Sequence, residues 1–156
     1  MSLAQDYFKT AQQRGRLPVD ATLTDAYAFC SRDALADALG QLVVHGIKRA
    51  TASGYEMYQG GPDDPLPRAG SYHVILGRGN QPLCVILTDC VCVKPFNLVT
   101  AEDAYLSGED DRSLAAWRAG YAAYFQQAYP EEAGIPFDSA TCHVVLEYFH
   151  VVVSGD

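Results

Sequence analysis

The feature that most constrains the fold is an almost continuous apolar run near the C-terminus, CHVVLEYFHVVV at residues 142–153. An apolar run of this length, without strict alternation of polar residues, predicts a β-strand covered on both faces and therefore in the interior of a sheet. Glu147 interrupts the run. A carboxyl in that position must face solvent, a cation or a hydrogen-bond donor, because burying it alone is unfavourable. We expect Lys48 or Arg49 as the cation and a supporting role for Glu147, with a place in a pocket wall as the alternative.

The rest of the chain predicts helices and antiparallel strands around this strand. Periodicity and turn residues predict the following elements: helices over residues 3–14, 32–45 and 113–128, a short helix that begins at Thr100, and extended segments over residues 49–58, 72–76 and 83–93. Hairpin-sized gaps such as GRGNQP separate the strands, so their pairing should be mostly antiparallel. The expected class is α+β, with long strands that curl into a small barrel flanked by helices.

Two helices carry local signals of their own. Ser31 is the expected N-cap of the helix over residues 32–45. The expected buried stripe of that helix consists of Leu35, Leu39, Leu42 and Val43. Thr100 and Asp103 have the spacing of a capping box, with Asp in place of the usual Glu. The expected inner face of the longest helix consists of Leu114, Trp117, Tyr121, Tyr124 and Phe125.

Composition limits the partners that the protein can bind. The chain has 156 residues and a net charge of −8, with 11 lysines and arginines. Tight binding to duplex nucleic acid needs many such cations, so a nucleic-acid ligand should be small or single-stranded. No apolar run approaches the ~18 residues of a membrane span, and no signal peptide opens the chain. Five cysteines without a CxxC spacing predict reduced thiols and a cytoplasmic location.

The segment HGIKRATASGYEMY, residues 45–58, places two cations and two hydroxyl groups where a helix gives way to a strand. Lys48 and Thr51 are close enough in sequence for the amine to act as a base toward the hydroxyl. The alternative is structural, because lysine is favoured at a helix C-terminus and threonine in a strand. Spacing alone favours the structural alternative.

A second group of polar residues is SGEDDRS, residues 107–113, directly before the longest helix. Carboxylates are favoured at a helix N-terminus without any function. The functional alternative is that Glu109 or Asp111 turns inward as an acid–base group or as an acceptor for a base. Cys84, Cys90 and Cys92 share strand parity, but no histidine lies at ligand spacing, so we expect neither a metal nor a cofactor.

Three longer motifs resemble the ASCH domain family, in particular its longer bacterial subgroup. They are G-x-K-x-A-T-A-S at residues 46–53, P-F-N-x-V at 95–99 and A-Y-x-x-G-E-x-D-x-S-L-x-x-W at 104–117. The resemblance covers residues 28–153 and implies a PUA-like fold, a small and mostly antiparallel barrel flanked by helices. The length of 156 residues predicts a single domain, and the resemblance leaves residues 1–27 as an N-terminal helical extension.

The resemblance also implies a cleft that binds RNA or a nucleotide-like ligand. A shorter relative hydrolyses N4-acetylcytidine with a K-x-x-T motif and a glutamate from a loop before a later helix. Carried over to this chain, the catalytic residues are Lys48, Thr51 and Glu109, although alignment on the following helix would place the glutamate at Asp110. The expected ligand-binding residues are Arg49, Ser53, Tyr55, Glu56, Asp111, Arg112 and Trp117. Tyr55 or Trp117 would stack on the base.

Three functions remain open at this point. The chain is an amidohydrolase for an N4-acetylcytidine-like nucleoside, a recognition module for RNA or a modified nucleotide without chemistry, or a weak ribonuclease. In the first, Lys48 deprotonates Thr51 and Glu109 protonates the leaving amine. The acidic net charge favours a modified nucleoside or short single-stranded RNA over a long nucleic acid as the partner. The sequence does not indicate an oligomeric state.

Overall fold

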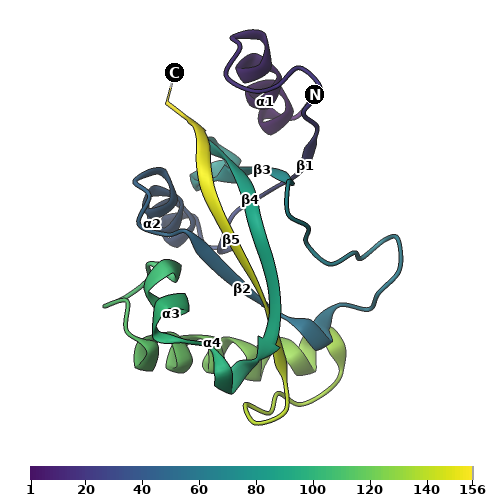
Figure 1. Ribbon diagram of the computed structural model, residues 1–156, viewed down its shortest axis with the longest axis vertical. Coiled ribbons are helices and arrows are strands. Elements are labelled where there is room, and N and C mark those ends of the chain that lie inside the picture. The colour runs from purple at the N-terminus through teal and green to yellow at the C-terminus, as the bar shows by residue number, and fades with distance from the viewer. Residues whose placement is uncertain (156) are drawn as a thin grey trace. The chain divides into compact units, whose positions relative to one another are not determined.

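The computed structural model describes residues 1–155, and its strands form one mixed sheet (Figure 1). The strands are β1 (Leu23–Tyr27), β2 (Ala50–Gly54), β3 (Tyr72–Leu76), β4 (Pro82–Pro95) and β5 (His143–Ser154), in the spatial order β1-β3-β4-β5-β2. The apolar run therefore lies in the interior of the sheet, between β4 and β2, which confirms the prediction for it. The α+β class is confirmed as well.

The predicted barrel is not confirmed, because the sheet is open within the described residues. Its strand order ends at β1 on one side and at β2 on the other. The pairs β3–β4 and β2–β5 are antiparallel as predicted, but β1 pairs with β3 in parallel. The strand β1, with the sequence LTDAY, was not predicted and falls in the expected helical extension. The strands β1 and β3 are not joined by a short hairpin turn, because the chain forms α2 and β2 between them.

The chain forms two units. The first contains residues 1–48 and 69–89 and the residues from 149 onward, and the second contains residues 49–68 and 90–148. The helices are α1 (Leu3–Gln13), α2 (Asp33–Val44), α3 (Ala101–Ser107) and α4 (Leu114–Ala128). Within the described residues, no helix is both long and apolar enough to cross a membrane.

In the first unit, successive residues of β3 point into different cores, as the period of a strand requires. Val74 packs with Phe8 of α1, whereas Ile75 packs with Val43 of α2 and with Phe149. One helix thus covers each face of this part of the sheet. The hairpin predicted at GRGNQP joins β3 to β4 through a 3₁₀ turn at Arg78–Asn80.

The helix α2 is present as predicted, but its buried face differs. The N-cap is Arg32 rather than Ser31, without a side-chain hydrogen bond. The buried stripe consists of Ala36, Gly40 and Val43, and the predicted Leu35 is 39% exposed. The reason is a close approach of the helix to the sheet at Gly40, where a Cβ atom would lie 2.3 Å from Cδ1 of Leu83. Val43 of the predicted stripe is buried and Leu39 and Leu42 are half-buried, but the small residues Ala36 and Gly40 lie closest to the sheet in place of Leu35.

In the second unit, α4 packs through aromatic side chains onto β5 and the segment that follows β4. The buried members of this core include Phe96, Trp117, Phe125 and Tyr129. Tyr124, predicted to face inward, is 54% exposed. The predicted capping box at α3 is confirmed, because Thr100 accepts from the Asp103 amide and Asp103 accepts from the Thr100 amide.

Candidate functional site

The pairing of β2 with β5 places the hydroxyl residues of the ATAS segment on one face. Thr51 lies opposite Glu147, and Ser53 lies opposite Val145. Directly opposed residues of an antiparallel pair share a face, and so do residues two positions apart. Thr51, Ser53 and Glu147 therefore form one polar face in the second unit, whereas Leu146 on the other face belongs to the aromatic core. We call these three residues the polar face.

Glu147 lacks the cationic partner that the sequence predicted. Of the described residues, none forms a hydrogen bond or an ion pair with its carboxyl. Burial of the half-buried side chain raises the pKa of Glu147 to about 7. Desolvation disfavours the charged carboxylate, and nothing nearby compensates for it. The expected pairing with Lys48 or Arg49 is therefore wrong.

Tyr58 extends the polar face toward a hollow in the surface. Its phenol oxygen lies 2.8 Å from Oγ of Ser53. Burial raises the pKa of this phenol, and the charge of Glu147 raises it further. The hollow has a volume of about 440 Å³, and the residues that line it include Tyr55, Glu56, Tyr58 and Arg68. Volumes of this size accommodate small molecules.

Lys48 is the most deeply buried charged residue of the predicted site, at 1% exposure. It belongs to the first unit, where its Nζ lies 5.1 Å from the centre of the Phe29 ring. Lysine is almost never buried this completely unless it is paired, and buried lysines are the ones that serve as bases. Thr51 and Glu109 belong to the second unit, so the catalytic grouping of the three stays a prediction. Arg49 has an exposed side chain, and its amide donates to the Leu106 carbonyl.

The loop that carries Glu109 has an unusual backbone. Gly108, Asp110 and Arg112 all have positive φ, at 76°, 52° and 63°. Positive φ is uncommon for residues other than glycine, particularly for a long side chain such as arginine. Strained backbone of this kind concentrates at functional sites. Oγ of the buried Ser107 lies 3.4 Å from Oε2 of the half-buried Glu109.

The neighbours of Glu109 in the loop hold the loop in place. Arg112 donates from Nε to the Tyr105 carbonyl, and its guanidinium lies 3.5 Å from the centre of the Tyr105 ring. Asp111 accepts from the Ser113 amide, and hydrogen bonds from Ser113 lower the pKa of Asp111. Both predicted ligand-binding residues thus have structural contacts, and a ligand would have to share them.

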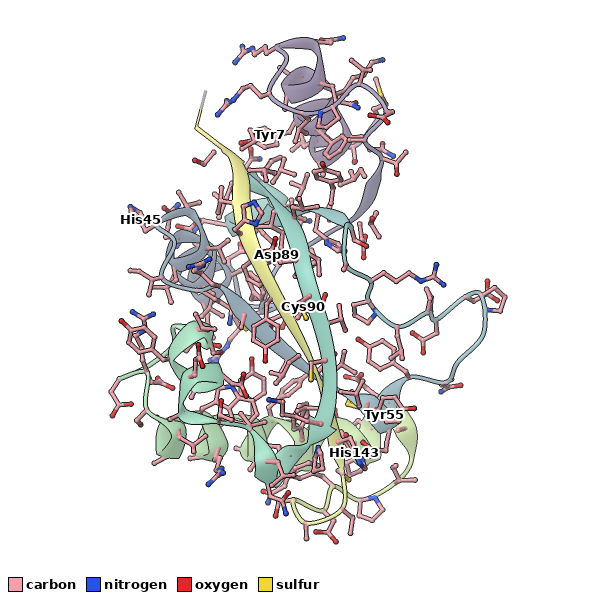
Figure 2. The ribbon with its side chains drawn as sticks, in the orientation of Figure 1. Tyr7, His45, Tyr55, Asp89, Cys90 and His143 are labelled. Carbon is pink, nitrogen blue, oxygen red and sulfur yellow. The ribbon has the colours of Figure 1, made fainter. Side chains whose placement is uncertain are left out.

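Glu56 is tied to the strand β5 rather than free for a ligand. Its carboxylate accepts from the His143 amide and Nδ1 and from the Tyr129 hydroxyl at 2.8–3.0 Å. Burial alone would raise the pKa of Glu56, but these hydrogen bonds outweigh burial and lower it. Figure 2 shows Tyr55 beside His143, with ring centres 6.1 Å apart. Tyr55 is 42% exposed and can offer a ring face to a base.

Trp117 lies inside the aromatic core. It is 6% exposed, and its ring is stacked on Tyr121 at a centre-to-centre distance of 4.5 Å. Its faces are occupied by Phe96 and Tyr121, so of the two residues predicted to stack on a base, Tyr55 is the one with an exposed ring. In the part of the chain that the structure describes, no three His, Cys, Asp or Glu side chains could together hold a metal.

A buried acid cluster near α3 was not predicted from the sequence. Asp103 accepts from Lys94 Nζ at 2.9 Å and from the Tyr148 hydroxyl at 2.6 Å. Burial would raise the pKa of Asp103, but Lys94, Tyr148 and the helix cap hold it at about 2. The capping-box spacing identified Asp103, but its two side-chain partners lie too far away in sequence for any local pattern. This cluster supports α3 and carries no exposed group.

Comparison with known proteins places the chain in a described family. A family model for the ASCH domain matches residues 25–153. The structure is similar to the crystal structure of an ASCH domain from Lactobacillus crispatus JV V101, with a TM-score of 0.86 and 28% identity over 96% of this chain and 94% of that one. It is also similar to a protein from Enterococcus faecalis V583, with a TM-score of 0.81 and 29% identity over 96% and 92%. No curated protein matches the sequence. The resemblance found in the motifs is thus confirmed.

Proposed function

Since the chain belongs to the ASCH domain family, we propose that it binds a nucleotide-like ligand and hydrolyses an N-acylated nucleoside of the N4-acetylcytidine kind. The observation that carries the proposal is the burial of Lys48, at 1% exposure, in the G-x-K-x-A-T-A-S motif. A lysine placed only to complement a helix end would keep its ammonium in water. A buried amine is the form in which lysine acts as a base.

The proposed reaction uses three side chains of this chain. Lys48, as the free amine, takes the proton of the Thr51 hydroxyl, and the threonine oxygen attacks the acyl carbon. Glu109 gives its proton to the departing exocyclic nitrogen, so the C–N bond breaks and an acyl-enzyme remains. Glu109 then takes a proton from water, and the resulting hydroxide attacks the ester carbonyl. Lys48 returns its proton to the departing Thr51 oxygen, so acetic acid leaves and all three side chains are restored. Two features support the proposal: the strained loop at Glu109 and the place of the half-buried Thr51 on the polar face.

The backbone of β2 can stabilise the oxyanion of this reaction. β2 is an edge strand of the described sheet. Along one side of such a strand, alternate N–H groups do not take part in the ladder. We assign the oxyanion donors to the outward amides among Thr51, Ala52 and Ser53, beside the Thr51 hydroxyl. Donors of this kind contribute much of the rate in acyl transfer.

Acetate release from N4-acetylcytidine tests the proposal. Wild type should turn over, whereas Lys48→Ala and Glu109→Ala should each lose at least about 10²-fold in kcat, the usual contribution of a general acid or base. Lys48→Arg keeps the charge but cannot act as a base, so it should be as inactive as Lys48→Ala. Glu132→Gln, at an exposed position, is the matched control and should keep full activity.

The second candidate, a recognition module without chemistry, is favoured by the hollow beside Tyr55 and Tyr58. It predicts no acetate release but measurable nucleoside binding. In that case Lys48→Arg should bind as wild type does, since only the charge is needed. Turnover by Lys48→Ala at the wild-type rate would refute the amidohydrolase mechanism directly.

A further inference from the structure

We infer that Glu147 contacts the ligand, and that as a neutral carboxyl it hydrogen-bonds a base edge carrying an acceptor beside a donor, such as N3 and the amino group of cytosine. The inference rests on the proposed nucleotide binding and adds a specificity-determining residue. The predicted catalytic and ligand-binding residues do not include Glu147.

Glu147 has unused hydrogen-bonding capacity in a half-buried position. Among the described residues its carboxyl has neither a hydrogen bond nor an ion pair. The carboxyl oxygens are not among the fully buried atoms without a partner, so a ligand can reach them although the rest of the side chain is half-buried. Its neighbours on β5, Val145 and Leu146, are fully buried apolar residues, so packing gives no reason for a carboxyl here. The geometry therefore points to a partner from outside the chain.

The groups around Glu147 suit a planar polar ligand. Thr51 lies directly opposite, and Ser53 is its diagonal neighbour across the same strand pair. Side chains in these relations have Cβ atoms about 5 Å and about 7 Å apart. The Tyr58 hydroxyl meets Ser53 at 2.8 Å, and Tyr58 also lines the hollow. Tyr58 therefore connects the polar face with the hollow, so a ring that contacts Tyr58 lies next to the polar face.

The protonation state of Glu147 decides which edge it can bind. A neutral carboxyl offers one O–H donor beside one C=O acceptor, whereas a carboxylate offers acceptors only. The neutral form complements N3 and the amino group of cytosine, and ionisation replaces its donor with a second acceptor that faces N3. Burial raises the pKa of Glu147 to about 7, so the neutral form is populated near neutral pH. Among the described residues, the Tyr58 phenol is a titratable group that interacts with Glu147, and Asp64 acts on the same phenol.

Binding of cytidine at pH 6.0 and pH 8.5 tests the inference. If only the neutral form binds, the apparent Kd for wild type should rise about 10- to 30-fold between the two pH values, because the competent fraction falls by that factor. Glu147→Gln keeps a donor beside an acceptor without titrating, so its Kd should be the same at both pH values. Glu147→Leu should bind about 10-fold more weakly at pH 6.0. Glu132→Gln, the matched control, should keep the wild-type pH dependence.

The outcomes separate this inference from the proposed function. Guanosine presents two donors side by side, so its binding to wild type should not weaken as Glu147 ionises. Wild-type affinity for cytidine that does not change with pH, or a Glu147→Leu variant that binds like wild type, would overturn the inference alone. Wild type that binds no nucleoside at either pH would overturn both. Urea denaturation of each variant at both pH values confirms that a folded protein is compared.

Discussion

The raised pKa of Glu147 predicts how the free energy of unfolding changes with pH, in the absence of any ligand. Its pKa of about 7 in the folded chain compares with an ordinary value of 4.5. A pKa raised on folding means that the folded state favours the protonated form. The favourable contribution is therefore complete below pH 4.5 and is lost as the pH rises through 7. The difference of about 2.5 pKa units corresponds to about 3 kcal/mol at pH 8 and above.

The substitution Glu147→Gln removes this titration and keeps the shape of the side chain. We expect it to raise the free energy of unfolding by up to about 3 kcal/mol at pH 8.5, and by close to nothing at pH 4.5. Urea denaturation of both proteins at half-unit steps between these pH values would measure the difference, since all other titrating groups are shared. Glu132→Gln at an exposed position should show no such trend. A stability difference that is constant with pH, or largest at pH 4.5, would refute the reasoning.

Four further substitutions test the stability of the fold. Asp103→Asn should lower the free energy of unfolding by about 2 kcal/mol at pH 7, because the pKa of Asp103 is lowered to about 2 in the folded protein. This loss should shrink as the pH falls from 3.8 toward 2. Urea denaturation midpoints measured against pH would test it. Gly54→Ala should cost about 1–3 kcal/mol, since its Cβ would lie 2.4 Å from the Tyr129 ring. Gly120→Ala should instead stabilise α4 by up to about 1 kcal/mol, because a Cβ atom there would have no neighbour within 4 Å. Thermal melts that rank the Gly54 variant above the Gly120 variant would contradict both predictions. Burial lowers the pKa of His73, so the protein should lose stability as pH falls below 6.5, and His73→Phe should reduce that loss.

Local signals in the sequence predicted several elements correctly. The apolar run identified the interior strand β5, and the spacing of Thr100 and Asp103 identified the cap of α3. The GRGNQP turn identified the β3–β4 hairpin. Each of these signals lies within a few residues of the structure that it specifies. For such elements, propensity and period decide the outcome without help from the rest of the chain.

The errors concern structure that depends on distant residues. The edge strand β1 has the sequence LTDAY, with neither a long apolar run nor a turn signal, and its parallel partner β3 follows more than 40 residues later. The sheet is open within the described residues, and closure depends on pairing between strands that no local pattern describes. The stripe on α2 was misplaced because leucines suggest burial, while Gly40 is the residue that lets the helix approach Leu83.

In the candidate site, too, local sequence identified residues, whereas contacts with distant residues could not be predicted. The motif predicted Lys48 as a functional residue, and the structure places it at 1% exposure. The same motif could not show that Trp117 is enclosed by core aromatics or that Glu56 is held by His143. Glu147 stood out in the sequence as a charge in an apolar strand, but its missing partner became evident only from the register of β2 and β5.

The long strands β4 and β5 are each divided between the two units, with one end in the first unit and the other end in the second. This division affects folding during synthesis. Neither unit is a continuous stretch of chain, and β5 is the last of the described elements to leave the ribosome. Until residues 143–154 emerge, β2 has no partner in the ladder, and β4 presents a long unpaired edge. A nascent chain at this stage is exposed to the intermolecular strand pairing that unprotected edges promote. Fragments that end before β5 should therefore aggregate rather than fold as either unit alone.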